Sequence, residues 1–453
     1  MLYTFIHKVA LLALKLFFNE VTIQNREKVP QNSPVIFVAN HPNFFMDPLI
    51  VGSCCPRILH FFAKSTIFSS RFTNLFLDKL NLIPIYRKID NEANMGKNVD
   101  SFIRGYEILE KNGAFLIFPE GISMGRRVLE KIKTGAARIG LEAEARNEFS
   151  LNCCIIPIGI SYSDLVRFRS DIMVRFGEPI FLKDFQKEYY SNEKQTVKRL
   201  TGKIEDALNE LTNYVQSEEI EDIVDGLELV YKMELMTEMG MELDDKNDDF
   251  LTSKLLTDAV QWYNENDPTL VEEFRKKLNA YLGLLRQLDI RDEFLDPVRQ
   301  EAQNWGKTKT IIFLLLGSPL FIWGLITNYI PYKVPRMLVD LGKTHSSEMA
   351  SWKLAYGFIL FIIYYGFSAL IIWNITGHIT FTILFLISLI PSGNFALYYS
   401  KSLLKYRQHV KFLSFFYKKR KIIFDTIKQR IDLLQFIEES KNRYQKILLG
   451  QKL

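Results

Sequence analysis

The spacing of hydrophobic and polar positions changes along the chain and divides it into regions of different character. Up to about Val215, short apolar runs alternate with longer stretches in which apolar residues recur at helical intervals. This alternation is typical of an α/β domain with a mostly parallel sheet flanked by helices. The expected strands are 35–39, 58–62, 82–86, 114–118, 155–160 and 172–176, and the expected helices are 48–55, 66–80, 98–111, 134–146 and 194–215.

The first twenty residues form an apolar run that is interrupted by Lys8 and Lys15. A signal peptide would need an unbroken apolar run and a small-residue cleavage site, and the sequence has neither. The two lysines lie one heptad apart and share a helical face, so their ammonium groups can reach a membrane surface. The pattern predicts an interfacial membrane helix at 1–20, followed by the α/β domain at 21–215.

Residues 216–305 combine helical spacing with many carboxylates and few basic residues between them. The spacing of an EF-hand loop, with its central glycine, is absent from these acidic stretches. We therefore interpret the region as an acidic helical connector rather than a calcium site. Its clustered carboxylates are Glu218, Glu219, Glu221, Asp222, Asp225, Glu242, Asp244, Asp245, Asp248 and Asp249.

Residues 306–400 contain three long apolar stretches and are expected to form an α-helical transmembrane region. The stretches at 311–330 and 354–373 are each long enough to cross the hydrocarbon core of a bilayer. The third stretch, 379–399, is interrupted by Pro391-Ser392-Gly393, so it could cross the bilayer or dip in and return.

Basic residues flank the apolar stretches on both sides. Lys307 and Lys309 precede the first stretch, and the tail at 401–453 is basic and amphipathic. If both flanks are cytoplasmic, the number of full crossings is even. We therefore expect two spans and a third apolar segment that does not cross.

The composition excludes a disordered chain, because 48% of the 453 residues are hydrophobic and 24% are charged. The net charge of +5 is unevenly distributed, which suits an anionic membrane surface better than nucleic acid, and no nucleic-acid motif is present. The cysteines form two adjacent pairs, Cys54-Cys55 and Cys153-Cys154, without the spacing of a zinc or redox site. We expect them to be small buried residues in a reducing compartment.

The most specific chemistry lies where the first expected strand ends. The apolar run 35–39 leads into Asn40-His41, and Asp47 follows on the same connection. A carboxylate beside an imidazole can fix its tautomer and orientation, which would make His41 a general base for a hydroxyl. The alternative is that His41 is incidental and that Asp47 caps the next helix, with Pro48 in the first helical position.

Three further blocks follow later expected strands, whose carboxyl ends meet at one edge of a parallel sheet. The first ends in Arg87, whose guanidinium matches the geometry of a phosphate. The second, Phe118-Pro119-Glu120-Gly121, leads into Ser123 and a group of cations that includes Arg126 and Lys133. A carboxylate beside cations suits an acceptor with both hydroxyl and phosphate groups. The third, 155–159, is expected to line a cavity.

These blocks, in this order, resemble the glycerolipid acyltransferases. The motifs lie within about residues 35–160 and are specific as a set. Their order is NHPNFFMD, IPIYR, FPEGIS followed by KTGAARIG, and IIPIGI. The motif HPNFFMDP is similar to that of the family branch that includes fungal glycerol-3-phosphate acyltransferases.

The resemblance implies transfer of a fatty acyl group from acyl-CoA or acyl-carrier protein to a hydroxyl of glycerol 3-phosphate in phospholipid biosynthesis. It implies His41 as the base and Asp47 as its partner, with no metal and no cofactor beyond the acyl donor. It also implies an integral membrane protein whose catalytic domain lies on the cytoplasmic face of a bacterial inner membrane or the endoplasmic reticulum. The oligomeric state stays open. The expected substrate-binding residues are Arg87, Glu120, Gly121, Ser123, Arg126 and Lys133.

Three alternatives remain beside this hypothesis. The acceptor could be lysophosphatidate or another lysophospholipid. The chain could also be a catalytically idle lipid-binding protein of the same fold, although an idle copy would be free to lose His41, Asp47, Arg87 or Glu120. A metal-dependent hydrolase is disfavoured, because the nearest second histidine, His60, lies within an apolar run.

Overall fold

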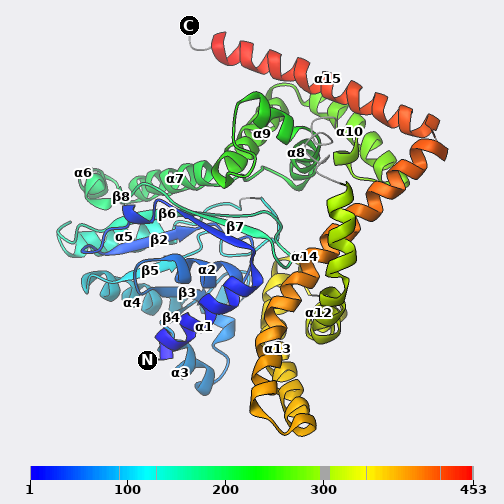
Figure 1. The fold of residues 1–453 in the computed structure, drawn as a ribbon. Coiled ribbons are helices and arrows are strands. Elements are labelled where there is room, and N and C mark those ends of the chain that lie inside the picture. Colours follow the sequence, from blue (N-terminus) through cyan, green and yellow to red (C-terminus); the bar gives the residue numbers. More distant parts are fainter. Residues whose placement is uncertain are drawn as a thin grey trace. The chain divides into compact units, whose positions relative to one another are not determined.

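The computed structural model describes residues 2–90, 92–128, 130–295, 307–342, 344–418 and 420–450 (Figure 1). The chain divides into two compact units. The first contains Met1–Glu218 and Gly342–Leu354, and the second contains Glu219–Leu341 and Ala355–Leu453. The five-part division expected from the sequence stays a prediction, and its boundary between residues 305 and 306 lies outside the described residues.

The first unit is built on an eight-stranded sheet with the order β1-β7-β6-β2-β5-β3-β4, in which β8 pairs with β6. The central strand β2 runs parallel to both β5 and β6, while β7 and β8 run antiparallel to β6. The expected α/β fold with a mostly parallel sheet is therefore confirmed. The strands are β1 Glu20–Gln24, β2 Val35–Ala39, β3 His60–Lys64, β4 Leu82–Ile85, β5 Ala114–Ile117, β6 Cys154–Tyr162, β7 Asp171–Phe176 and β8 Ile180–Phe181.

Three strands differ from the expectation. The apolar pattern did not predict β1 or β8, because β1 is an edge strand of mixed polarity and β8 has only two residues. β3 begins two residues later than expected. The segment before it is held as a loop by Arg57, which donates to the carbonyl oxygens of Pro30, Ser33 and Asn112.

Seven helices accompany the sheet among the described residues of the first unit. α3 begins later than expected because Ser70 and Thr73 form a capping box, in which each side chain accepts the backbone N–H of the other (3.1 and 2.9 Å). α6 was not predicted. The helices are α1 Leu2–Phe17, α2 Met46–Cys54, α3 Arg71–Lys79, α4 Asn98–Glu110, α5 Gly135–Arg146, α6 Gln186–Ser191 and α7 Glu193–Leu211.

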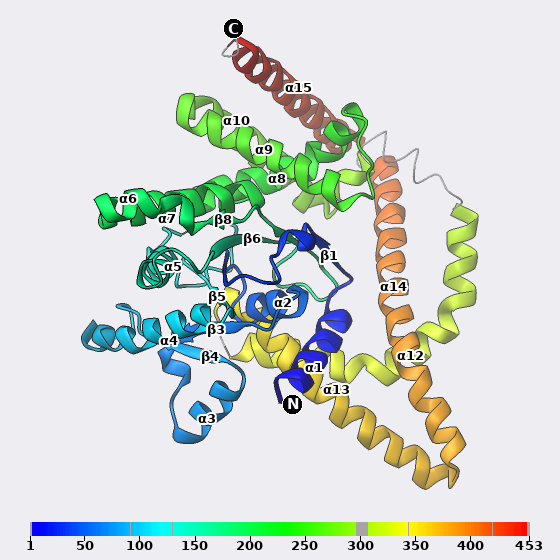
Figure 2. The same ribbon diagram turned by 90° about the vertical axis from the view of Figure 1, so that its left-hand side faces the viewer.

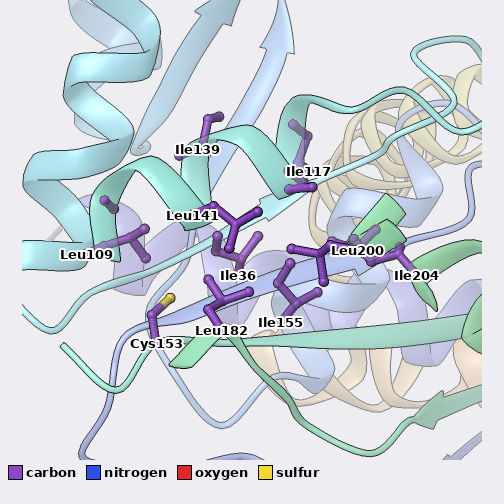
Figure 3. Packing of buried hydrophobic residues seen from close by; sticks show 14 of the residues in the cluster. Ile36, Leu109, Ile117, Ile139, Leu141, Cys153, Ile155, Leu182, Leu200 and Ile204 are labelled. Carbon is purple, nitrogen blue, oxygen red and sulfur yellow. The ribbon is translucent and has the colours of Figure 1, made fainter. Parts of the chain in front are cut away.

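Helices cover both faces of the sheet, and β2 contributes to both cores. Ile36 and Val38 pack with residues of α4, α5 and α7, whereas Val35, Phe37 and Ala39 pack with residues of α1 and α2. In Figure 2 the first group of helices lies to the left of the strands and the second to the right. Figure 3 shows the first of these cores. Because β2 is buried on both faces, its sequence is continuously apolar, as expected for the centre of a parallel sheet.

The four cysteines are buried and unpaired, as expected. Cys153 packs into the core on the α5 side of the sheet and Cys154 into the core on the α2 side. Burial raises the pKa of Cys54 to about 12 and that of Cys55 to about 11. These thiols therefore stay protonated and act as small apolar side chains.

The second unit contains a helical part and three long apolar helices. The helical part joins the acidic helices to the last helix of the chain through ion pairs. The helices are α8 Glu218–Glu238, α9 Lys246–Asn266, α10 Pro268–Leu288, α12 Lys307–Leu341, α13 Ser346–Thr376, α14 Ile379–Lys418 and α15 Arg420–Gly450.

The C-terminal tail neutralises part of the acidic connector. Arg430 on α15 forms a buried ion pair with Asp292 (Nε to Oδ1, 2.9 Å), and the Tyr281 hydroxyl donates to the same oxygen (2.5 Å). Lys441 on α15 pairs with Glu238 at the end of α8 (2.7 Å). The connector and the tail, which the sequence suggested as separate regions, thus pack together through opposite charges.

Three helices are long and apolar enough to cross a membrane, by length and composition: Lys309–Leu341, Ser346–Thr376 and Ile379–Gln408. The expected interruption at Pro391-Ser392-Gly393 is wrong, because α14 continues through it. Proline removes one helical hydrogen bond, and close packing against a neighbouring helix can compensate for that loss. Such packing exists here, since a Cβ on Gly324 of α12 would collide with the carbonyl of Ser392. The number of full crossings stays a prediction.

A buried asparagine connects the three apolar helices. Asn328 on α12 donates to the carbonyl of Leu389 on α14 (3.2 Å), and its Oδ1 accepts the hydroxyl of Tyr365 on α13 (2.5 Å). Polar contacts of this kind fix the pairing of helices in an apolar environment.

The start of α13 belongs to the first unit rather than to the bundle of apolar helices. Ala350 packs into the core on the α2 side of the sheet, and Lys353 donates to the carbonyl of Val166 (3.3 Å). Ser346 and Ser347 lie beside Gly125, where a Cβ would collide with them. The segment between two apolar helices is therefore part of the packed α/β unit.

We predict that Arg430→Ala destabilises the packing of α15 on α10 by about 3–5 kcal/mol, because it leaves the Asp292 carboxylate buried without its charge partner. Amide hydrogen exchange in α10 and α15 of the full chain measures this change. The control is Arg443→Ala, which removes an exposed ion pair with Asp267 from the same helix and should change the exchange little. Equal effects of the two substitutions would contradict the prediction.

Candidate active site

His41 and Asp47 form a directly bonded pair at the carboxyl end of β2. His41 Nδ1 lies 2.8 Å from Asp47 Oδ2, and the imidazole is 16% exposed while the carboxylate is fully buried. The same Oδ2 accepts the backbone N–H of Asn43 (2.6 Å), and Oδ1 accepts the Tyr162 hydroxyl (2.5 Å). Because Asp47 accepts at every contact, the imidazole proton lies on Nδ1, and Nε2 is left as the acceptor.

The alternative in which Asp47 caps the next helix is wrong. α2 begins at Met46, its N-cap is Phe45, and Asp47 lies within the first turn, where Pro48 does not prevent the helical conformation. The backbone N–H groups of Met46 and Asp47 both donate to the carbonyl of Asn43 (2.9 and 3.2 Å). The Asp47 carboxylate therefore does not cap α2, and it bonds to the His41 imidazole instead.

Glu120 lies behind the histidine and is almost fully buried. Its Oε1 accepts the backbone N–H of His41 (2.8 Å), and its carboxyl group also accepts the backbone N–H of Glu130. Burial raises the pKa of Glu120 to about 8, against the lowering effect of these two N–H groups. Its contacts are those of a residue that positions the histidine loop, and its expected contact with a substrate hydroxyl stays a prediction.

Gly121 brings Arg87 and Lys133 to the site. Arg87 Nη1 donates to the Gly121 carbonyl (2.6 Å), and the Lys133 side chain lies where a Cβ of Gly121 would be. Gly121 has a φ of +74°, a backbone conformation that disfavours any larger residue. Arg87 Nε and Nη2 each donate a hydrogen bond of 2.7 Å to the Asp90 carboxylate. These bonds lower the pKa of Asp90.

Ser123 and Arg126 have protein partners. Ser123 Oγ accepts the backbone N–H of Phe44 (2.9 Å), and Gly125 N–H donates to the carbonyl of Pro42 (3.0 Å), so this loop supports the histidine loop. Arg126 pairs with Glu218 (3.4 Å). The structure therefore brings seven of the expected residues into one connected cluster: His41, Asp47, Glu120, Gly121, Ser123, Arg87 and Lys133.

Sequence reasoning assigned no role to the residues that orient the histidine pair. Tyr162 comes from the carboxyl end of β6, and burial raises its pKa well above the usual value, so its hydroxyl stays a donor. Phe118 stacks on the His41 ring at a centroid distance of 4.0 Å. Asn40 joins β2 to β6 by two bonds to the backbone of Ile160 (2.7 and 2.8 Å). Tyr162 could have been found, because it lies two residues beyond the expected strand 155–160, near the same edge of the expected parallel sheet as His41.

Among the ranges described, no group of three or more His, Cys, Asp or Glu side chains could hold a metal ion. The N–H of Gly121, a candidate donor to an oxyanion, donates instead to the Phe118 carbonyl (3.2 Å). Among the described residues, His41 Nε2 has no hydrogen-bond partner, so it is left as an acceptor at the site.

Comparison with known proteins supports the resemblance. Residues 20–161 match the family model described as Acyltransferase. Two relatives in Saccharomyces cerevisiae, Glycerol-3-phosphate O-acyltransferase 1 and 2, are each 27% identical, over 213 and 199 residues. These matches cover 46% and 42% of this chain but only 27% and 26% of the relatives, about a quarter of their length.

A similar solved structure is that of the 1-acyl-sn-glycerophosphate (LPA) acyltransferase PlsC from Thermotoga maritima. It is 19% identical with a TM-score of 0.33, and the match covers 45% of this chain and 79% of that chain. The α/β fold is established here by the sheet itself rather than by this likeness. The family model and the two relatives confirm that residues 20–161 resemble the glycerolipid acyltransferases.

We predict that Glu120 makes stability fall as the pH rises. Its pKa is about 8 when folded and about 4.5 when exposed, so its contribution is complete below about pH 4.5 and is lost as the pH rises to about 8. Glu120→Gln, which cannot ionise, should reduce the loss of unfolding free energy by up to about 1.4 kcal/mol per pH unit in that window.

Denaturant unfolding of the first unit at several pH values measures the slope. The control is Glu210→Gln, an exposed carboxyl on α7, which should leave the slope unchanged. The same slope in the wild-type chain and in Glu120→Gln would show that this carboxyl is ionised in the folded protein.

Proposed function

We propose that the chain is a membrane-bound O-acyltransferase that transfers a fatty acyl group from a thioester to a hydroxyl of glycerol 3-phosphate. The observation that carries the proposal is the His41–Asp47 pair, in which a buried carboxylate holds Nδ1 and leaves Nε2 available as a base. The names of the two yeast relatives favour glycerol 3-phosphate as the acceptor.

The reaction needs one proton acceptor and no protein nucleophile, because the thioester is already activated. His41 Nε2 takes the proton of the acceptor hydroxyl while its oxygen attacks the thioester carbonyl. The tetrahedral intermediate collapses, the C–S bond breaks, and the thiolate leaves with the proton returned by the imidazolium. The products are an ester and a free thiol.

The surroundings of His41 suit this role. Asp47 stabilises the imidazolium that forms during attack, and its other lone pairs are held by Asn43 and Tyr162. The stacked Phe118 ring limits rotation of the imidazole. Arg87 and Lys133, which meet at Gly121, supply positive charge for the phosphate of the acceptor.

The membrane would supply or receive the acyl chain. Three apolar helices of suitable length support an integral membrane location. We assign the catalytic domain to the cytoplasmic face, because basic residues flank the apolar region on both sides. The donor is acyl-CoA or acyl-carrier protein, and the reaction uses no other cofactor.

We predict that the purified full-length chain in lipid nanodiscs transfers labelled acyl groups from acyl-CoA or acyl-carrier protein to glycerol 3-phosphate. His41→Ala should lower the rate by about 10²–10⁴-fold without unfolding the protein, because it removes the base. His378→Ala, an exposed histidine between two apolar helices, is the control and should keep full activity.

The same assay tests the acceptor and the class of function. Transfer to lysophosphatidate but not to glycerol 3-phosphate would replace the proposed acceptor by a lysophospholipid. Absence of transfer from either donor to every acceptor, with lipid binding retained, would favour the idle lipid-binding protein. High residual activity in His41→Ala would remove His41 from the role of base.

We predict that Tyr162→Phe lowers kcat by roughly tenfold, since the hydroxyl donates to a charged carboxylate and such bonds contribute about 1.5–3 kcal/mol. The control is Tyr189→Phe, which removes a hydroxyl bond to the Glu142 carboxylate away from the site. An unchanged kcat in Tyr162→Phe would limit Tyr162 to a structural role.

A further inference from the structure

The first residues of α13 belong to the first unit, although the helix as a whole is long and apolar enough to cross a membrane. The residues concerned are 346–354, which we call the start of α13. They lie far along the chain from the histidine loop, residues 40–45 between β2 and α2. Their contacts nevertheless lead to that loop by two separate routes.

The first route runs through Gly125. A Cβ on Gly125 would lie 2.5 Å from the backbone nitrogen of Ser347 and 2.6 Å from Ser346 Oγ, so the two segments are in close contact. The Gly125 N–H donates to the carbonyl of Pro42 (3.0 Å), the residue after His41. Gly125 therefore contacts the start of α13 and bonds to the histidine loop.

The second route runs through the loop between β6 and β7. Lys353 donates to the carbonyl of Val166 in this loop (3.3 Å). The adjacent carbonyl, that of Leu165, accepts Asn43 Nδ2 (2.8 Å). The backbone N–H of Asn43 donates to Asp47 Oδ2, the oxygen that bonds to the imidazole. Lys353 and the histidine loop thus bond to neighbouring carbonyls of one loop.

The same segment also packs into the core that adjoins the histidine loop. Ala350 is fully buried in the cluster that contains Ala39, the last residue of β2, and Met46, the first residue of α2. These two residues flank the histidine loop on either side. A base must lie within hydrogen-bond reach of its substrate, and a displacement of about 1 Å can lower the rate by about 10²-fold. Support of this loop therefore matters for catalysis.

We propose that the start of α13 is a positioning element of the active site, which holds the two loops that support the histidine loop. The inference rests on the proposed acyl transfer. The pose of the His41 imidazole then depends on a segment that lies between two helices suited to a membrane. These apolar helices contribute to the geometry of the site as well as to anchoring, because one of them begins with residues that support the base.

The first test changes Lys353 in the full-length chain in lipid nanodiscs. Lys353→Met keeps the apolar part of the side chain and removes the donor to Val166. It should lower kcat for transfer to glycerol 3-phosphate by roughly three- to tenfold and leave KM nearly unchanged, because it disturbs the base and not the substrate contacts. Lys353→Arg keeps a donor and should restore most of kcat. The control is Lys194→Met, an exposed lysine of α7, which should keep full activity.

The second test changes Gly125. Gly125→Ala should lower kcat by roughly 10²-fold, because the added Cβ forces the loop away from Ser347 or from the histidine loop. The control is Gly240→Ala, since Gly240 has a similar positive φ (+67° against +72°) and no described atom lies within 4 Å of its Cβ position. Equal losses of activity in the two variants would overturn the proposal, because backbone strain alone would then explain them.

Hydrogen exchange, measured by mass spectrometry, separates positioning from general destabilisation. The backbone N–H groups of Asn43 and Phe44 donate to Asp47 and Ser123, so they report on the histidine loop. In Lys353→Met they should exchange faster, while β2 and β5 exchange as in the wild-type chain. Unchanged exchange in the histidine loop would overturn the proposal, and so would uniformly faster exchange across the sheet.

Failure of this inference is distinguishable from failure of the proposed function, because hydrogen exchange requires no turnover. A chain that transfers nothing, but in which Lys353→Met raises exchange in the histidine loop alone, would keep the positioning role and lose the proposed function. A chain in which His41→Ala abolishes transfer, while Lys353→Met and Gly125→Ala keep full activity, would lose only the positioning role.

Discussion

The burial of the Asp47 carboxylate is the constraint on which the site depends. A buried charge is costly unless donors surround it, and here the donors come from three parts of the chain: the His41 ring, the Asn43 backbone and the Tyr162 hydroxyl. The loop after β2, the start of α2 and the end of β6 must therefore meet at one point. Misplacement of any one of them would leave the carboxylate unsatisfied, so the geometry of the pair and the stability of this corner are linked.

The sheet makes that meeting possible. β2 is parallel to both neighbours and buried on both faces, so its carboxyl end opens at the same edge as those of β5 and β6. His41 follows β2, Glu120 follows β5 and Tyr162 ends β6, and each contributes a different function. Two cations adjoin them at Gly121, where Arg87 donates to the backbone carbonyl and the Lys133 side chain lies in the space of the missing Cβ. The same few residues thus determine both the chemical groups of the site and the backbone conformation around it.

The second unit follows a different principle, in which opposite charges join segments that are distant in sequence. The acidic helices and the basic last helix appeared from composition as a solvated connector and a membrane-directed tail, yet Arg430 and Asp292 form a buried pair between them. The composition shows the charge of each segment, but it does not show with which other segment that charge pairs. In the same way Pro391 suggested a break, but contact with α12 allows α14 to continue. Both differences arise because long-range packing outweighs local preference.

The sequence by itself determined the parallel α/β fold, most strand and helix positions, the apolar helices and the set of blocks that includes His41, Asp47, Arg87 and Glu120. It could do so because hydrophobic periodicity and turn residues are local properties, read within a few residues of each other. The tertiary structure alone decided that Asp47 bonds to His41 rather than capping α2, that Glu120 supports the backbone of His41, and that Tyr162 and Phe118 orient the imidazole. Those choices depend on hydrogen bonds between residues up to 115 positions apart, which no local pattern encodes.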